Sequence, residues 1–115
     1  MVVFQTYYAL LPDWGNDVTK HMEVERRVAQ STGAGLIDQY AWFLPWLKSD
    51  LAGYRTIMCD PGHLNALGNC LFGILAARCF GIPDPPLPPD MQQPIADRLA
   101  ILERHGATQR IPVAG

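Results

Sequence analysis

Apolar residues in this chain fall into short blocks separated by proline, glycine and charged residues. Residues 2–10 are rich in β-branched and aromatic side chains, so they predict a buried strand. A helix capped by Asp17 or Thr19 and running to about Thr32 is predicted next, and a second short strand over residues 36–39. Strand, helix and strand at this spacing predict a βαβ unit with two parallel strands.

The first predicted helix has an apolar and a charged side. Its apolar side is expected to face the core through Val24, Val28 and Ala29. Its charged side is expected to face solvent through Lys20, Glu23, Arg26 and Arg27. Gly33 is expected to end the helix.

Residues 40–47 are densely aromatic and contain Pro45. They predict either a short kinked helix or a wall that lines a cleft, since binding pockets are lined by such side chains. Aromatic residues at this density usually belong to the core. Residues 66–80 then predict an almost unbroken apolar helix, capped by Asn65 and closed by Gly81.

The C-terminal part begins with a proline-rich arm, residues 82–94, that is expected to be extended in its first half. Pro94 suits the first turn of an amphipathic helix over residues 95–105. Its apolar stripe is Ile95, Leu99 and Leu102. Gly106 is expected to end this helix, and the tail after it to be loose.

The composition and net charge favour a globular protein over a disordered, nucleic-acid-binding or membrane-spanning one. The chain has 115 residues, of which 49% are hydrophobic and 17% charged, so it is expected to form one globular domain. A net charge of −2 gives no reason to expect nucleic acid or an anionic membrane as a partner. No apolar run approaches the roughly 18 residues of a membrane span. The first residues lack a basic segment, so no signal peptide is predicted and the compartment stays open.

The three cysteines predict neither a disulfide nor a metal site. Cys70 and Cys79 lie nine positions apart in the predicted helix and therefore on opposite faces. Cys59, His63 and Cys70 lack the paired spacing of zinc ligands. Buried thiols are expected.

The candidate chemistry lies in the turn between Asp60 and His63. Pro61 followed by Gly62 is typical of a type II β-turn, because proline presets φ near −60° and glycine accepts a positive φ. Such a turn brings its first and fourth residues within about 7 Å of each other. A carboxylate beside an imidazole can accept the Nδ1 proton and leave Nε2 free to take a proton from a nucleophile. A surface turn with an incidental histidine is the alternative, although such turns seldom adjoin a helix that must be buried.

The same segment resembles a known family. Asp60-x-x-His63, then Leu64-Asn65, then Gly68 and an apolar helix look like the C-terminal catalytic block of SGNH (GDSL-type) serine esterases. That block usually reads Asp-Gly-x-His-Pro-Asn-x-x-Gly. Here Pro61 and Gly62 replace Gly-x, and Leu64 replaces the proline. The resemblance covers residues 2 to about 81.

The resemblance implies a fold and an activity. The fold would be α/β, a partial three-layer flavodoxin-like SGNH hydrolase fold made of the last βαβ unit, the catalytic loop and the C-terminal helix. Residues 1–81 would be the hydrolase-like part, followed by the arm at 82–94 and the terminal helix and tail at 95–115. His63 would be the general base of a carboxylic-ester hydrolase and Asp60 its orienting partner. No cofactor or metal is implied. The partners would be a small-molecule or acylated ester and the missing N-terminal half of the domain.

Other parts of the family pattern do not occur. The only serines are Ser31 and Ser49, and neither stands in a Gly-Asp-Ser or Gly-x-Ser-x-Gly context. Residues 14–17 resemble the oxyanion motif Gly-x-Asn-Asp at the wrong spacing, so Asn16 and Asp17 are interpreted as loop and helix cap. Two other classes stay open: an inactive fragment that serves as a binding or structural α/β module, and a histidine-dependent enzyme that uses Cys59 as nucleophile.

Overall fold

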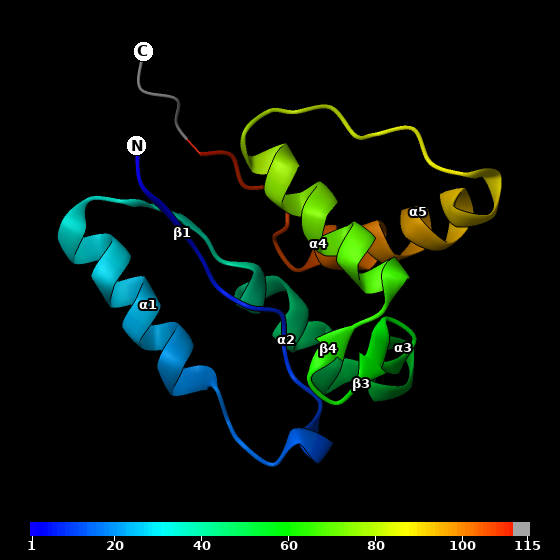
Figure 1. Cartoon of the computed structure of the whole chain (residues 1–115), viewed down its shortest axis with the longest axis horizontal. Helices are drawn as coiled ribbons and strands as arrows, with labels where there is room; N and C mark the ends of the chain where they lie inside the picture. Colours follow the sequence, from blue (N-terminus) through cyan, green and yellow to red (C-terminus); the bar gives the residue numbers. More distant parts are fainter. Residues whose placement is uncertain (112–115) are drawn as a thin grey trace.

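Two short parallel strands, β1 (Val3–Gln5) and β2 (Gly35–Ile37), lie beside the first helix in the computed structural model, which describes residues 1–111 (Figure 1). Val3 pairs with Gly35 and Gln5 with Ile37. The strands are joined by α1 (Thr19–Thr32), which ends at Gly33 in the left-handed conformation, with a φ of 69°. The predicted parallel pair, its connecting helix and its glycine cap are therefore confirmed, and the fold mixes helices and strands.

Strand β1 is shorter than the predicted strand over residues 2–10. Its partner β2 ends at Ile37, because Gln39 already begins α2 (Gln39–Ser49). The Thr6 N–H donates the last bond of the ladder to the Ile37 carbonyl at 3.0 Å, and the Tyr7 N–H donates instead to the Met22 sulfur. The apolar residues after β1 thus join the core as irregular chain.

The predicted core-facing side of α1 is only partly confirmed. Ala29 is buried as predicted, whereas Val24 and Val28 are exposed and Met22 is buried in their place. Arg26, expected to face solvent, donates from Nε and Nη2 to the two carboxylate oxygens of Asp38 at 2.7 and 3.0 Å. Positions 22, 26 and 29 share one helix face. The ion pair at the end of β2 and the Met22 contact therefore orient α1, rather than its valines.

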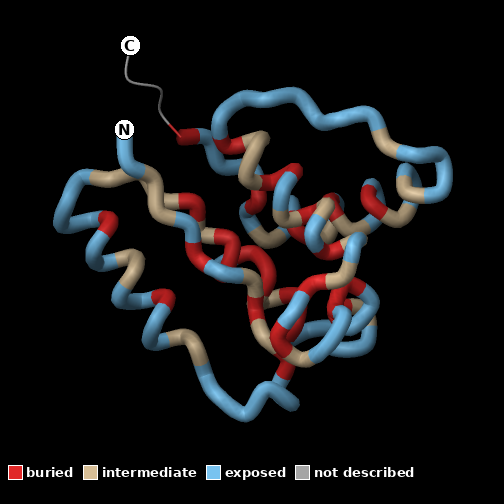
Figure 2. Tube along the Cα trace, in the orientation of Figure 1, coloured by how far each residue is buried: buried red, intermediate tan, exposed pale blue. Residues whose placement is uncertain are grey.

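The aromatic segment at residues 40–47 lies in α2, a helix that contains Pro45 and contributes to the core (Figure 2). Phe43 and Trp46 are at most 1% exposed. They pack against Tyr54 of α3 (Leu51–Arg55), with ring centroids 6.3 and 5.2 Å away. Of the two predicted roles, these side chains take the core role, while Tyr40 also borders a surface cavity.

The last two helices confirm the predicted apolar pattern but not every boundary. Helix α4 (Ala66–Cys79) matches its prediction to within one residue. Helix α5 (Pro89–Arg104) begins six residues before the predicted start, inside the segment that was expected to form the extended arm. Pro89 suits the first helical position because its missing N–H would have no partner there. Pro94 lies inside the helix, and the predicted stripe of Ile95, Leu99 and Leu102 is buried against α2 and α4.

The chain after α5 packs onto the molecule, so the prediction of a loose tail is wrong for residues 107–111. Ala107 and Ile111 are buried, and the Ile111 N–H donates to the Cys79 carbonyl at 2.8 Å. The Gln109 side chain donates to the Leu36 carbonyl on the outer edge of β2 at 2.8 Å. Residues 112–115 lie outside the described part of the chain.

The three cysteines differ in exposure. Cys79 is buried and Cys70 half-buried, and burial raises the pKa of both thiols. Cys59 is exposed, contrary to the expectation of buried thiols. Across residues 1–111, no helix has the length and apolar character that crossing a membrane requires.

Candidate catalytic site

A β-hairpin holds the candidate site. Strand β3 (Met58–Asp60) runs antiparallel to β4 (His63–Leu64), and Asp60 pairs directly with His63. The turn between them is not type II, because Gly62 does not have a positive φ. Instead the Asp60 carboxylate accepts the Gly62 N–H at 2.8 Å, so the side chain itself stabilises the turn.

Asp60 and His63 touch through their side chains. Nδ1 of His63 lies 2.8 Å from Oδ1 and 3.0 Å from Oδ2 of Asp60. The pKa of the Asp60 carboxyl lies below its usual value because the Gly62 N–H and then the imidazole bond to it. A carboxylate at this place favours the tautomer with a proton on Nδ1. The His63 side chain is 69% exposed, and no residue in the described part of the chain bonds to its Nε2. The site therefore presents an oriented imidazole nitrogen to solvent.

The loop before α1 supports this turn from one side. The Leu11 N–H donates to the Pro61 carbonyl at 3.0 Å, and the Tyr8 hydroxyl donates to the Gly62 carbonyl at 2.8 Å. Trp14, the last residue of the short 3-10 helix η1 (Pro12–Trp14), lies over Gly62. The sequence pattern alone does not connect these residues to the site. Nothing in their local pattern identifies a contact with residues about fifty positions away.

Asn65 and Gly68 fix the hairpin to α4. The Asn65 side chain accepts the Gly68 N–H at 3.0 Å, which confirms the predicted N-cap, and donates to the Thr56 carbonyl at 2.9 Å. A Cβ atom at Gly68 would lie 2.4 Å from the Ile57 carbonyl oxygen and 2.8 Å from a Leu64 methyl carbon. These two motif residues therefore have structural roles that place His63 at the end of the helix.

We expect Gly68→Ala to destabilise the protein by about 1–3 kcal/mol, because the new methyl group meets backbone that cannot move away cheaply. Urea denaturation followed by circular dichroism measures this. Gly73→Ala is the matched control in the same helix. A Cβ there meets nothing within 4 Å, so helix propensity predicts a gain of about 0.5–1 kcal/mol. Equal effects of the two substitutions would contradict the close packing at Gly68.

The structure brings no serine to His63 within the described residues. The Ser31 hydroxyl donates to the Val28 carbonyl in α1, and the Ser49 hydroxyl donates to the Trp46 carbonyl in α2. The predicted helix cap at Asp17 or Thr19 is wrong, because Val18 is the N-cap residue of α1 and makes no side-chain capping hydrogen bond. The Asp17 carboxylate instead accepts the N–H of Thr19, the first helical residue, at 2.9 Å from the preceding loop. Cys59 makes no hydrogen bond to His63. Asp60 and His63 are thus paired without a serine or a bonded cysteine beside them in the described part of the chain.

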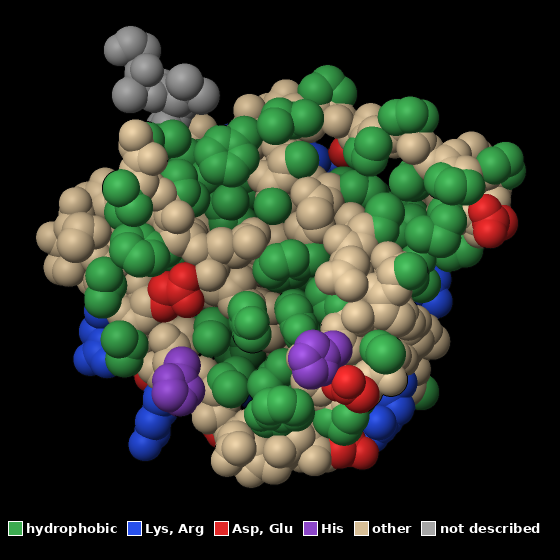
Figure 3. Space-filling view, viewed as in Figure 1, with side chains coloured by type: hydrophobic (Ala, Val, Ile, Leu, Met, Phe, Trp, Pro, Cys, Tyr) green, Lys and Arg blue, Asp and Glu red, His purple; other side chains and the backbone are tan. Residues whose placement is uncertain are grey.

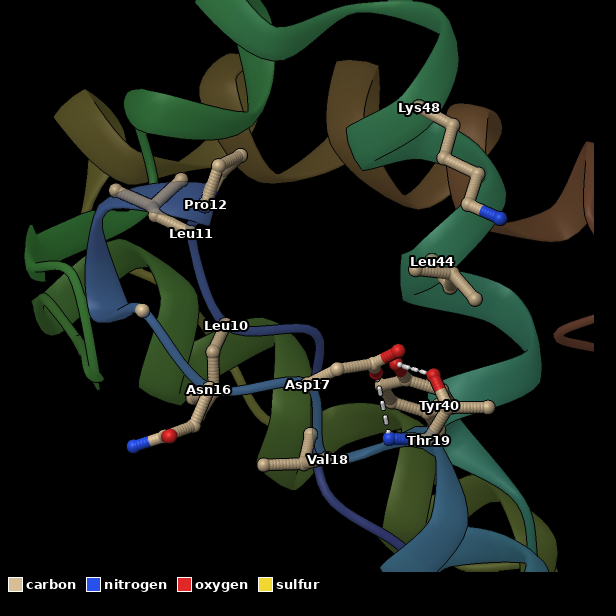
Figure 4. Close-up of a pocket in the computed structure, with 11 residues that line it drawn as sticks. Leu10, Leu11, Pro12, Asn16, Asp17, Val18, Thr19, Tyr40, Leu44 and Lys48 are labelled. Carbon is tan, nitrogen blue, oxygen red and sulfur yellow. Dashed lines mark hydrogen bonds between the residues drawn. The ribbon is translucent and has the colours of Figure 1, made fainter.

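Two surface cavities lie near the supporting loop. The larger, about 400 Å³, lies between residues 10–19 and α2, with Lys48 and the hydrogen-bonded pair Thr19 and Tyr40 on its wall (Figure 4). It does not include Asp60 or His63. The smaller, about 210 Å³, borders Asp60 directly and is also lined by Cys59 and by the ion pair of Asp13 and Arg55. The smaller cavity is therefore the one adjacent to the candidate site.

Hydrophobic side chains gather in the middle of one face of the molecule, over β1 and the chain that leads from it (Figure 3). Three residues of this stretch, Val2, Tyr7 and Trp14, are 65%, 55% and 43% exposed.

Comparison of the chain with protein-family models, with curated proteins and with solved structures finds no match.

Proposed function

We propose that this chain supplies the general base of an SGNH-type carboxylic-ester hydrolase. The observation that carries the proposal is the contact of the Asp60 carboxylate with Nδ1 of an exposed His63, at 2.8 and 3.0 Å. The serine nucleophile and the oxyanion donors would come from a second segment, the N-terminal half of the domain.

The chemistry follows from the orientation of the imidazole. Nε2 of His63 would take the proton of a serine hydroxyl as that oxygen attacks the ester carbonyl, and would then give it to the departing alcohol. In the second half-reaction it would take a proton from the water that attacks the acyl-enzyme, and would return it to the serine oxygen as the acyl–serine bond breaks and the carboxylic acid leaves. Asp60 would stay ionised, hold the tautomer and stabilise the imidazolium. These steps require no cofactor.

The free edge of β1 is consistent with the proposal that a second segment completes the domain. Val2 and Thr6 bond to β2 through the Val2 carbonyl and the Thr6 N–H. Because alternate residues of a strand point to opposite neighbours, the backbone groups of Val3 and Gln5 point away from β2. No described residue bonds to them, whereas Gln109 covers the opposite edge at Leu36. One edge of the pair is therefore capped and the other is free to accept a strand.

A three-layer flavodoxin-like arrangement would use this free edge. Parallel sheets are normally covered on both faces and flanked by further strands. Here two strands carry α1 on one side, and exposed hydrophobic side chains follow β1 on the face shown in Figure 3. Further strands at the β1 edge, with helices of their own, would extend the sheet and cover these side chains.

Complementation tests the proposal. The isolated chain is expected to hydrolyse p-nitrophenyl acetate no faster than the buffer, because no serine adjoins His63. Co-expression with an N-terminal segment that carries Gly-Asp-Ser and Gly-x-Asn-Asp is expected to produce esterase activity. A stable complex without activity would contradict the proposal and favour the alternative, a binding or structural α/β module.

A further inference from the structure

Trp14 and Gly62 are in close contact, and the contact depends on the absence of a side chain at Gly62. A Cβ atom on Gly62 would lie 2.3 Å from Cζ3 and 2.6 Å from Cε3 of the indole. Gly62 is buried although the turn that contains it is flanked by two exposed residues, Asp60 and His63. Since its φ is not positive, the backbone there does not demand glycine. The indole is therefore what requires a glycine at this position.

The same indole reaches His63. The ring centroids lie 6.4 Å apart with an interplanar angle of 83°, the edge-to-face arrangement that aromatic pairs prefer. Among the described residues, the side-chain hydrogen bonds of His63 are those that join Nδ1 to the Asp60 carboxylate. An imidazole that is 69% exposed would move between rotamers if nothing packed against its ring.

Trp14 and the turn form one connected unit. The Trp14 N–H donates to the Leu11 carbonyl at 2.9 Å, and the Leu11 N–H donates to the Pro61 carbonyl of the turn at 3.0 Å. Asp13 is also held, because its carboxylate accepts from Arg55 at 2.8 Å. The indole is thus anchored through its own backbone to the turn that it covers.

We propose that Trp14 is a positioning residue for His63, acting by packing on Gly62 and against the imidazole ring. Its functional meaning rests on the proposed esterase function, but its effect on the imidazole does not. Held between the Asp60 carboxylate and the Trp14 indole, the ring keeps one rotamer and one tautomer. Nε2 then stays in the direction from which it would meet a nucleophile, and placement errors of about 1 Å at such a group can cost about 100-fold in rate.

The test is a nitrogen-15 NMR measurement of the His63 tautomer in the isolated chain. In the unmodified chain the proton is expected mainly on Nδ1. Trp14→Ala is expected to lose at least half of that preference, and Trp14→Phe to retain most of it, because an aromatic ring remains. Phe80→Ala, which removes an aromatic side chain of equal 43% exposure at the end of α4, is the control and is expected to change nothing. An unchanged tautomer in a folded Trp14→Ala protein would overturn the proposal.

Gly62→Ala provides a second measurement that keeps the indole in the protein. The added methyl group must displace the indole, so it is expected to shift the tautomer as Trp14→Ala does. In a Trp14→Ala background the same substitution is expected to add almost nothing, since contacting residues are not additive. Equal effects in both backgrounds would show that the indole is not responsible.

Activity in the complemented protein separates the two proposals. Trp14→Ala is expected to lower kcat by about 10-fold or more with little change in KM, and Trp14→Phe to restore most of it. If Trp14→Ala shifts the tautomer while His63→Ala leaves activity intact, the esterase function fails and the positioning role stands. If His63→Ala removes activity while Trp14→Ala changes neither the tautomer nor kcat, the esterase function stands and the positioning role of Trp14 fails.

Discussion

His63→Ala is expected to lower ester hydrolysis by the complemented protein by on the order of 10²–10⁴-fold or more, because it removes the group that takes the serine proton. The exposed Nε2 and the Asp60 contact at Nδ1 make His63 the one residue of the site that can act in this way. The measurement is kcat with p-nitrophenyl acetate, with circular dichroism to show that the variant is folded. His63 contributes little packing, since most of its side chain is exposed, so the fold should survive.

Three further variants serve as comparisons for the His63→Ala measurement. Asp60→Asn is expected to cost as much as His63→Ala or less, because an amide stabilises the wrong imidazole tautomer. Ser31→Ala and Ser49→Ala are expected to leave the activity unchanged, since both hydroxyls bond within their own helices. If His63→Ala leaves the activity of the complemented protein unchanged, the segment from Asp60 to His63 is a surface turn with no catalytic role. Activity of the isolated chain that depends on Ser31 or Ser49 would show that the nucleophile lies in this chain.

Phe43→Ala is expected to destabilise the protein by about 3–5 kcal/mol, which is a large share of the 5–15 kcal/mol that typically stabilises a domain. Phe43 is fully buried in α2, and its ring meets those of Tyr54 and Phe72 at 6.3 and 6.2 Å. Removing it leaves a cavity between three helices that cannot close without moving them. Urea denaturation of the isolated chain measures the loss.

Phe80→Ala is the matched control for this substitution. Its side chain is 43% exposed, so its removal is expected to cost under about 1 kcal/mol. If Phe43→Ala and Phe80→Ala lowered the free energy of unfolding equally, the aromatic residues of α2 would not form the core. The alternative, in which they line a cleft, would then be favoured.

Local geometry explains which parts of the site were predictable. Asp60 and His63 are three residues apart, so a short turn of any common type brings them together, and their contact does not depend on the turn type. The type itself was predicted wrongly. Pro61 and Gly62 suggested a positive φ, but the glycine is needed for the indole of Trp14. That contact joins residues 48 positions apart, and no local pattern encodes it.

The same distinction applies to the helices. Asn65 caps α4 through a hydrogen bond to Gly68, three residues away, and Gly33 ends α1 in the left-handed conformation, so both ends were evident in the sequence. The orientation of α1 was not. Its valines suggested one buried face, whereas the Arg26 bond to Asp38 turns another face inward.

The sequence by itself therefore determined the parallel strand pair, the two capped helices and the closeness of Asp60 to His63. Each depends on hydrophobic periodicity or on hydrogen bonds between residues a few positions apart. Only the tertiary structure decided how long β1 is, which face of α1 is buried, and that Trp14 covers the turn between Asp60 and His63. These features arise from contacts between distant segments, which compete with local preferences and prevail where burial or a paired charge stabilises them more.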